Sequence, residues 1–315
     1  MRPLEDDRGS AFVMIVLMFT ALLAFVALAF DFGSWYRADR NIQAAADAAS
    51  LAAAQDLPDT ATASTTAVSY ANANVSGLNS WAPTFPDSNT IDVHLSRSVS
   101  GTFSKLVGVN SITVGAHARA QVGVPGSLKN VAPFVVNRTV ACNSATCFGS
   151  GNTLDLNFDN GGLDSVTRAG IVDLSGHSPS PNSCLATVNS ATTLKTWIKS
   201  GYPDALPINE WYPQLNDNGA KNGVKNELED LARTGQILLF PVFDDAQPVC
   251  GGGGGFHVIG WSAFVIQTVV SWKGNFNAGT NNHTLRGYFV TFIAHDVESV
   301  PGIPGFGVKV IKLVQ

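Results

Sequence analysis

The feature that most constrains this chain is an uninterrupted apolar run near its N-terminus, from Ala11 to Phe30. Thr20 is the only polar residue in the run, and twelve of its twenty residues are Leu, Ile, Val or Phe. Twenty helical residues, at about 1.5 Å each, cover the roughly 30 Å hydrocarbon core of a bilayer. Those twelve side chains favour insertion by roughly 4 to 7 kcal/mol. The run therefore predicts one membrane anchor.

The run is also compatible with two other interpretations. A cleaved secretory signal would fit the basic residues Arg2 and Arg8 and the small-x-small pattern at residues 27–29. The run is longer than a usual signal core, however, and helix-forming sequence continues past it. A buried helix of a soluble protein would show a polar face, which this run lacks. We favour a retained anchor and keep the signal sequence as the alternative.

An alanine-rich segment, Arg40 to Ala54, continues the predicted helix beyond the apolar run. Small residues let another helix approach closely, and a helix of alanine buries little apolar area by itself. We therefore expect a helix-packing surface whose partner is either the chain's own domain or a neighbouring copy. Proline disfavours a helical conformation in the residue before it, so Leu57-Pro58 should end the helix. The packing residues are predicted to be Ala44, Ala45, Ala48, Ala49, Ala52 and Ala53.

The same segment carries a family resemblance. Arg8-Gly9 and the apolar run precede a string of spaced residues, Asp31-x-Gly-x-x-Tyr-x-x-x-Arg-x-x-Gln-x-Ala-Ala-Asp-Ala-Ala-x-Leu-Ala-Ala-Ala54. This order resembles the N-terminal module of bacterial Flp/Tad pilus-assembly proteins of the TadE/TadG-like group. It is closer to the TadG side, because Met14 stands where TadE-type pseudopilins have a glutamate. No von Willebrand type A domain is recognised in the sequence. The resemblance implies a membrane-anchored protein of a pilus-assembly machine.

The remaining patterns predict an α+β fold. A small polar stretch at 59–75 is expected to form a second helix, and period-two alternation at 91–96 and 112–122 predicts two strands. The predicted organisation is a short cytoplasmic tail (1–10), a transmembrane anchor (11–30), an Ala-rich helix (31–57) and a small α+β module (58–122). A Gly/Pro-containing linker (123–130) and a β-rich extracytoplasmic domain (131–315) follow.

The β-rich domain is predicted from apolar runs bounded by Gly, Asn and Pro. Two short amphipathic segments that end at glycine predict helices at Ser190–Ser200 and Val224–Thr234. About 185 residues suffice to bury a core without further staples. The expected strands are Val131–Val136, Gln236–Phe243, Phe256–Trp272, Arg286–Ala294 and Val308–Val314.

Charge and cysteine content bear on location. Lys and Arg are sparse between residues 41 and 138, which eases translocation of the C-terminal body. Together with the single apolar run, the family resemblance implies a single-pass protein of the bacterial inner membrane. Its C-terminal body would lie in the periplasm or at the cell surface. The four cysteines, Cys142, Cys147, Cys184 and Cys250, predict two disulfides in that compartment. Pairing Cys142 with Cys147 closes a short loop and leaves Cys184 for Cys250, although unpaired thiols and other connectivities stay open.

Few motifs in the sequence indicate catalysis or cofactor binding. Gly251–Gly255 lacks the Lys-Ser/Thr of a phosphate loop, and no Gly-x-Ser-x-Gly occurs. His94 and His117 lie on the polar faces of the two predicted strands and form a candidate metal pair, although ordinary solvated histidines are the favoured interpretation. The net charge is −5 without a basic cluster, which argues against nucleic acid as a partner. We expect no enzyme activity, metal or cofactor.

The predicted function is a structural or assembly component of a Tad (Flp) pilus or related secretion apparatus. It would act through helix packing and an extracytoplasmic domain, with other proteins of the machine or its own copies as partners. The alternative is an anchored binding protein or adhesin for a glycan or protein ligand. An anchored hydrolase is the least supported. Genes for a pilus ATPase and a secretin beside this one would favour the first prediction.

Overall fold

The computed structural model describes residues 8–139, 147–158, 169–181, 191–215, 224–249, 253–273, 283–300 and 305–314. The chain divides into two compact units. The first holds residues 1–122 and 311–315, and the second holds residues 123–310. A long apolar N-terminal helix is followed by mixed helices and strands in two main sheets, so the predicted α+β class is confirmed.

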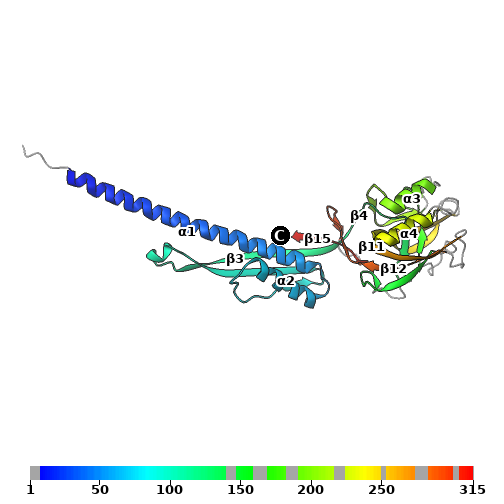
Figure 1. Ribbon diagram of the computed structural model, residues 1–315, viewed down its shortest axis with the longest axis horizontal. Coiled ribbons are helices and arrows are strands. Elements are labelled where there is room, and N and C mark those ends of the chain that lie inside the picture. The colour runs from blue at the N-terminus through cyan, green and yellow to red at the C-terminus, as the bar shows by residue number, and fades with distance from the viewer. Residues whose placement is uncertain are drawn as a thin grey trace, which may run out of the picture. The chain divides into compact units, whose positions relative to one another are not determined.

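The first unit is organised around one helix, α1 (Arg8–Ala54), of 47 residues. Its sequence lacks proline, and alanine dominates its second half, so the backbone hydrogen bonds run unbroken out of the apolar run. In Figure 1 the second half of α1 lies along the strands of its unit, whereas the first half stands clear of them. The predicted continuity between the apolar run and the alanine segment is present.

A second helix, α2 (Thr60–Asn74), packs against the C-terminal half of α1. Asp59 caps its start, because the carboxylate accepts the backbone N–H groups of Ala61 and Thr62, each at 3.1 Å. The buried residues of α2 are alanines at four-residue spacing, which place one narrow face of small side chains in the unit's core. They are Ala63, Ala67 and Ala71.

Three antiparallel strands complete the packing of the first unit: β1 (Thr84–Asp87), β2 (Thr90–Ser100) and β3 (Ser111–Pro125). The inward residues Ile91, Val93 and Leu95 of β2 join the same hydrophobic cluster as the two helices. The two long strands form a hairpin whose connection contains the short 3₁₀ helix η1 (Ser104–Val107) and turns at Gly108, with a φ of 85°. The alternation predicted for both strands therefore places their apolar residues on the face that packs against the helices.

The second unit contains a seven-stranded mixed sheet. Its hydrogen-bonded order is β6 (Thr153–Asn157), β12 (His283–Val290), β11 (Gly253–Trp272), β10 (Ile237–Val249), β5 (Phe134–Asn137) and β7 (Ala169–Ile171). The strand β9 (Glu210–Pro213) pairs with β11 off this path. The pairing of β10 with β5 is parallel, and the others are antiparallel. The five strands expected between residues 131 and 315 all occur; four have shifted bounds, and the strand expected at Val308–Val314 has the predicted bounds.

Both faces of this sheet are covered where β5 and the first half of β10 lie, which explains the near-continuous apolar runs of these two strands. Along β5, Phe134 and Val136 belong to one hydrophobic cluster, and Val135, between them, belongs to another. Along β10, Phe240 and Phe243 divide in the same way. The helices α3 (Ala191–Ser200) and α4 (Val224–Thr234) contact each other, and α4 packs on β11.

Short strands finish the second unit: β4 (Ser127–Leu128), β8 (Leu206–Pro207), β13 (Phe292–Ile293) and β14 (Ser299–Val300). Residues 123–130, predicted as a linker, contain the end of β3 and all of β4. The last strand, β15 (Val308–Val314), pairs in parallel with β13 at its start, and its final residues are assigned to the first unit. The chain therefore passes between the units twice, once within β3 and once within β15.

Candidate functional site

The first half of α1 presents apolar side chains on every side. From Phe12 to Phe30, the large apolar side chains are 37% to 74% exposed. Among the described residues, α1 is the only helix long and apolar enough to cross a membrane. A helix that is apolar all round suits a lipid environment. A secretory signal has the same composition, so this geometry fits both interpretations of the run.

Asp31 follows the apolar run directly and is fully buried. Its Oδ1 accepts the backbone N–H of Thr102 at 3.0 Å, and its Oδ2 accepts those of Phe103 and Ser104 at 2.9 and 2.6 Å. A buried carboxylate that receives three N–H bonds is well satisfied. The contact therefore fixes the tip of the β2–β3 hairpin to α1, one residue beyond the apolar run. Sequence reasoning missed this link, although a lone acidic residue at that position was a signal.

Aromatic and basic side chains follow on the next turns of α1. The rings of Phe32 and Trp35 meet edge to face, with centroids 5.5 Å apart. Arg40 Nε donates to the Tyr36 hydroxyl at 3.1 Å, and its guanidinium lies 5.3 Å from the centre of that ring. Trp, Tyr and Arg are typical of positions where a membrane helix leaves the hydrocarbon. They begin directly after the apolar run, at residues 32 to 40.

The predicted alanine surface divides between two environments. Four of its members are buried, three of them in the hydrophobic cluster that α1 shares with α2 and the sheet, whereas Ala44 is exposed and Ala48 is half-buried. Because small side chains permit close helix approach, the buried set explains how α2 can pack on α1. Only Ala44 and Ala48 remain open to another molecule. The buried members are Ala45, Ala49, Ala52 and Ala53.

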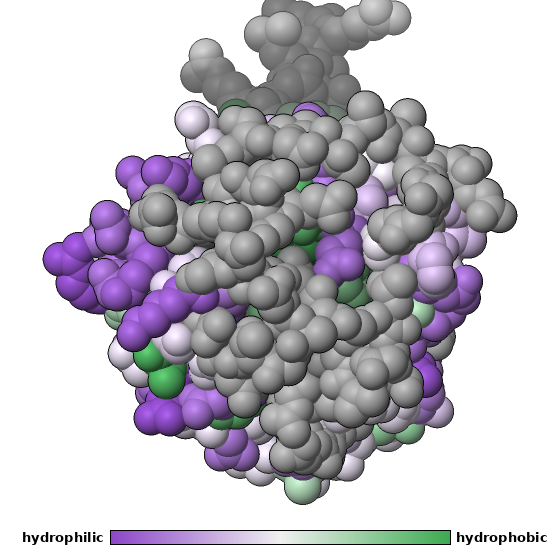
Figure 2. Space-filling view, turned by 90° about the vertical axis from the view of Figure 1, so that its right-hand side faces the viewer, coloured by the Kyte–Doolittle hydropathy of each residue, from purple (hydrophilic) through white to green (hydrophobic). Residues whose placement is uncertain are grey.

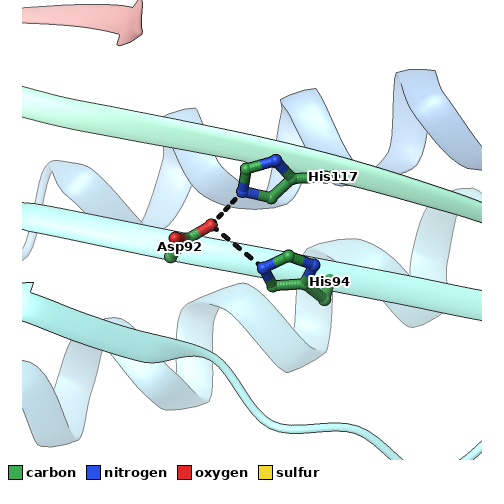
Figure 3. Close-up of side chains that lie close together, drawn as sticks. All are labelled: Asp92, His94 and His117. Carbon is green, nitrogen blue, oxygen red and sulfur yellow. Dashed lines mark hydrogen bonds and ion pairs between the residues drawn. The ribbon is translucent and has the colours of Figure 1, made fainter. Parts of the chain in front are cut away.

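The two candidate histidines lie directly opposite each other on β2 and β3, around Asp92 (Figure 3). The His94 and His117 rings stack, with centroids 4.1 Å apart and planes 11° apart. Asp92 Oδ1 is bonded to His117 Nε2 and lies 3.4 Å from His94 Nε2. Arg119, directly across from Asp92, donates to Oδ2 from Nε at 3.2 Å and from Nη2 at 2.5 Å.

These contacts explain why a carboxylate can be 6% exposed on a face predicted to be solvated. Burial raises the pKa of Asp92, but the bonds and charges of Arg119 and His117 outweigh it and hold that pKa below its ordinary value. The ligand atoms of Asp92, His94 and His117 lie within 4.8 Å of one another, so the trio has the composition of a metal site. Both imidazoles turn toward one carboxylate oxygen, however (Figure 3), so as they stand they are polar partners of Asp92.

A hollow of about 490 Å³ lies beside this cluster in the first unit. Gln43 and Asp47 of α1 line one part of it, and Gln43 Nε2 donates to Asp47 at 2.8 Å and to the carbonyl of His117 at 3.1 Å. His117, Arg119 and the end of β15 line the rest. The wall is mixed in character, and its polar side chains already have partners, since Gln43 bonds to Asp47 and both His117 and Arg119 bond to Asp92.

The second unit carries separate polar pairs. His177 Nδ1 is bonded to Glu210, and His257 Nδ1 meets Asp244 Oδ1 at 2.8 Å. Arg286 donates two hydrogen bonds to the Asp155 carboxylate, at 2.7 and 2.9 Å, and they lower the pKa of that carboxylate. Figure 2 shows one face of this unit, where the coloured surface is mostly hydrophilic and apolar residues form small spots. None of these pairs forms a nucleophile–base–orienting set among the described residues.

The predicted disulfide residues are only partly described. Cys147 is 9% exposed and packs in the core of the second unit. Cys142, Cys184 and Cys250 lie outside the described residues. The pairing of all four therefore stays a prediction.

Comparison with known proteins adds a family for the first part of the chain. Residues 9–56 match the family described as "Putative Flp pilus-assembly TadE/G-like". The chain thus carries a TadE/G-like domain over these residues, which confirms the resemblance noted in the sequence. No curated protein and no solved structure matches the chain.

Proposed function

We propose that this protein is a membrane-anchored structural component of a Tad (Flp) pilus or a related secretion apparatus, without enzyme activity. The observation that carries the proposal is the TadE/G-like match at residues 9–56, which coincides with α1. Within that match, an exposed apolar half is continuous with a half that packs into a folded module. The helix thus joins an anchor to a body.

The proposed mechanism is mechanical. The span at residues 11–30 holds the chain in the bacterial inner membrane, and the body lies outside the cytoplasm. The sparse Lys and Arg between residues 41 and 138 support that side of the membrane, and the disulfides predicted from the four cysteines agree with it. Ala44 and Ala48, left uncovered by the unit's own core, offer α1 a face for other proteins of the machine or for another copy.

The topology is tested with a reporter that is active only outside the cytoplasm, fused after Gln315. Activity of this fusion is the expected result, and activity of only a cytoplasm-dependent reporter would overturn the orientation. The intact mass of membrane-extracted protein separates the two interpretations of the apolar run. A retained anchor leaves residues 11–30 on the chain, whereas a cleaved signal removes them.

An anchored binding protein is the second candidate, and one observation favours it. The second unit has a hollow of about 520 Å³, which falls within the size range of small-ligand pockets. Its lining mixes Leu239 and Phe292 with Lys129, Asp296 and Glu298. Under this alternative, substitutions in that lining abolish ligand binding and leave pili intact. Loss of pili when Ala44 or Ala48 is replaced by leucine, with binding intact, would favour the assembly role.

A further inference from the structure

The tip of the β2–β3 hairpin exposes apolar side chains where a loop would ordinarily be polar. Leu106 is 87% exposed, and Phe103 and Val109 are 40% and 41% exposed. Lys105, also exposed, stands between them. A cluster of apolar groups on an exposed turn is costly in water and points to a partner that covers it.

The position of this tip along α1 identifies the partner. Asp31 holds the backbone of residues 102–104, and the ring of Phe103 meets that of Phe30 with centroids 6.1 Å apart. Phe30 is the last residue of the apolar run. In Figure 1 the hairpin runs beside α1, with its tip directed toward the helix's N-terminal half. The apolar side chains of the tip therefore continue the exposed apolar surface of the helix.

The backbone of the tip is also suited to an apolar environment, because most of its N–H groups have hydrogen-bond partners within the unit. N–H groups outside water need internal partners, because no solvent is there to receive them. Seven residues between 101 and 109 donate their N–H within the unit, three of them to Asp31 and the others to carbonyls of the loop. They are Gly101, Thr102, Phe103, Ser104, Leu106, Gly108 and Val109.

We infer that the β2–β3 hairpin tip inserts Phe103, Leu106 and Val109 into the lipid bilayer beside the span, as a second membrane contact. Lys105 extends its stem along the same surface and places its ammonium at the lipid phosphates. The aromatic residues Trp35 and Tyr36 mark the same boundary on α1. The inference rests on the proposed membrane anchoring of residues 11–30.

The test uses the full chain in vesicles of phosphatidylethanolamine and phosphatidylglycerol. A photoreactive diazirine amino acid replaces Leu106 in one variant, Phe25 of the span in a second and Tyr70 of α2 in a third. The three side chains are 87%, 72% and 48% exposed, so the probe disturbs little packing. Lipid adducts are counted by mass spectrometry of the labelled peptide. Flotation would be uninformative, because the span alone binds the vesicle.

The probe at position 106 should give lipid adducts like the probe at position 25. The yield should exceed that at position 70 on the order of tenfold, since burying a leucine-sized side chain shifts a partition by about that factor. Labelling at 25 but only background at 106 would overturn the inference and leave the anchor standing. Background labelling at both positions would contradict the proposed membrane anchoring of residues 11–30. Crosslinks from position 106 to a second copy of the chain would also overturn the inference, because they would show that the tip contacts another protein instead of the bilayer.

Discussion

The alanine segment allows the unit's own packing to be separated from association with other molecules. Ala49 has no exposed surface and lies in the cluster shared by α1, α2 and the sheet, whereas Ala44, on the same helix, is exposed. Ala49→Leu and Ala44→Leu make the same chemical change, and leucine is nearly as good a helix former as alanine. A difference between the two variants must therefore come from the environment of each position.

The magnitude follows from burial. Extra methylenes in a filled core cost about 1 to 3 kcal/mol, and α2, which packs against this part of α1, should bear much of that cost. Because 1.4 kcal/mol is a factor of ten, local opening should rise about 5- to 150-fold. Ala44→Leu should stay within about 0.5 kcal/mol of the parent, as surface substitutions do.

The assay is native-state hydrogen exchange of the α2 amides, Thr60–Asn74, in the full chain held in nanodiscs. Loss of protection is expected in Ala49→Leu alone. Under the proposed function, Ala44→Leu should instead lower crosslinking to another copy or to a pilus-machine protein. Equal exchange in the two variants would refute the packing argument. Unchanged crosslinking and normal pili in Ala44→Leu would refute the association face.

Three further predictions use other contacts. Asp31→Asn should abolish exchange protection of the amides at 102–104 while α2 stays protected, because a neutral amide receives N–H bonds less strongly. The pKa of Asp92 is depressed in the folded state, so its contribution to stability is present above about pH 3.9, the unfolded value, and is lost as pH falls through the folded value. A titration of the Asp92 carboxyl by NMR that gave an ordinary or raised pKa would contradict this. Cys184→Ala should destabilise more than Cys142→Ala, since the longer predicted loop contributes about 4 kcal/mol and the shorter one less. Non-reducing peptide mapping that found pairs other than Cys142–Cys147 and Cys184–Cys250 would contradict the predicted ranking of the two variants.

Much of the fold could be predicted from periodic and compositional signals in the sequence. The apolar run and the alanines predicted α1, and alternation predicted β2 and β3, because these signals are local and recur over many residues. The strands β6 to β9 were missed. Each has two to five residues, and each finds its partner far along the chain, as β6 does with β12. A segment so short carries too few positions for a period to be recognised.

The contacts of the candidate site were harder to predict, since they depend on register and on long-range docking. Asp31 and Thr102 are 71 residues apart, and no pattern near either one specifies the other. Alternation placed Asp92 on a solvated face, and only the register that sets it opposite Arg119 explains its burial. The histidine pair was found because both residues stood on polar faces of strongly periodic strands.

The junction at residue 31 bears on how such a protein would transmit force. A flexible linker between a membrane span and its body lets one move without the other. Here α1 continues without a break from the apolar run into the alanine segment, and the hairpin tip is bonded to the helix at the point of exit. A helix is stiff over this length, and three bonds from Asp31 prevent the tip from swinging away. On the proposed anchoring, a load on the first unit therefore reaches the span directly, which suits a structural role better than ligand capture on a mobile tether.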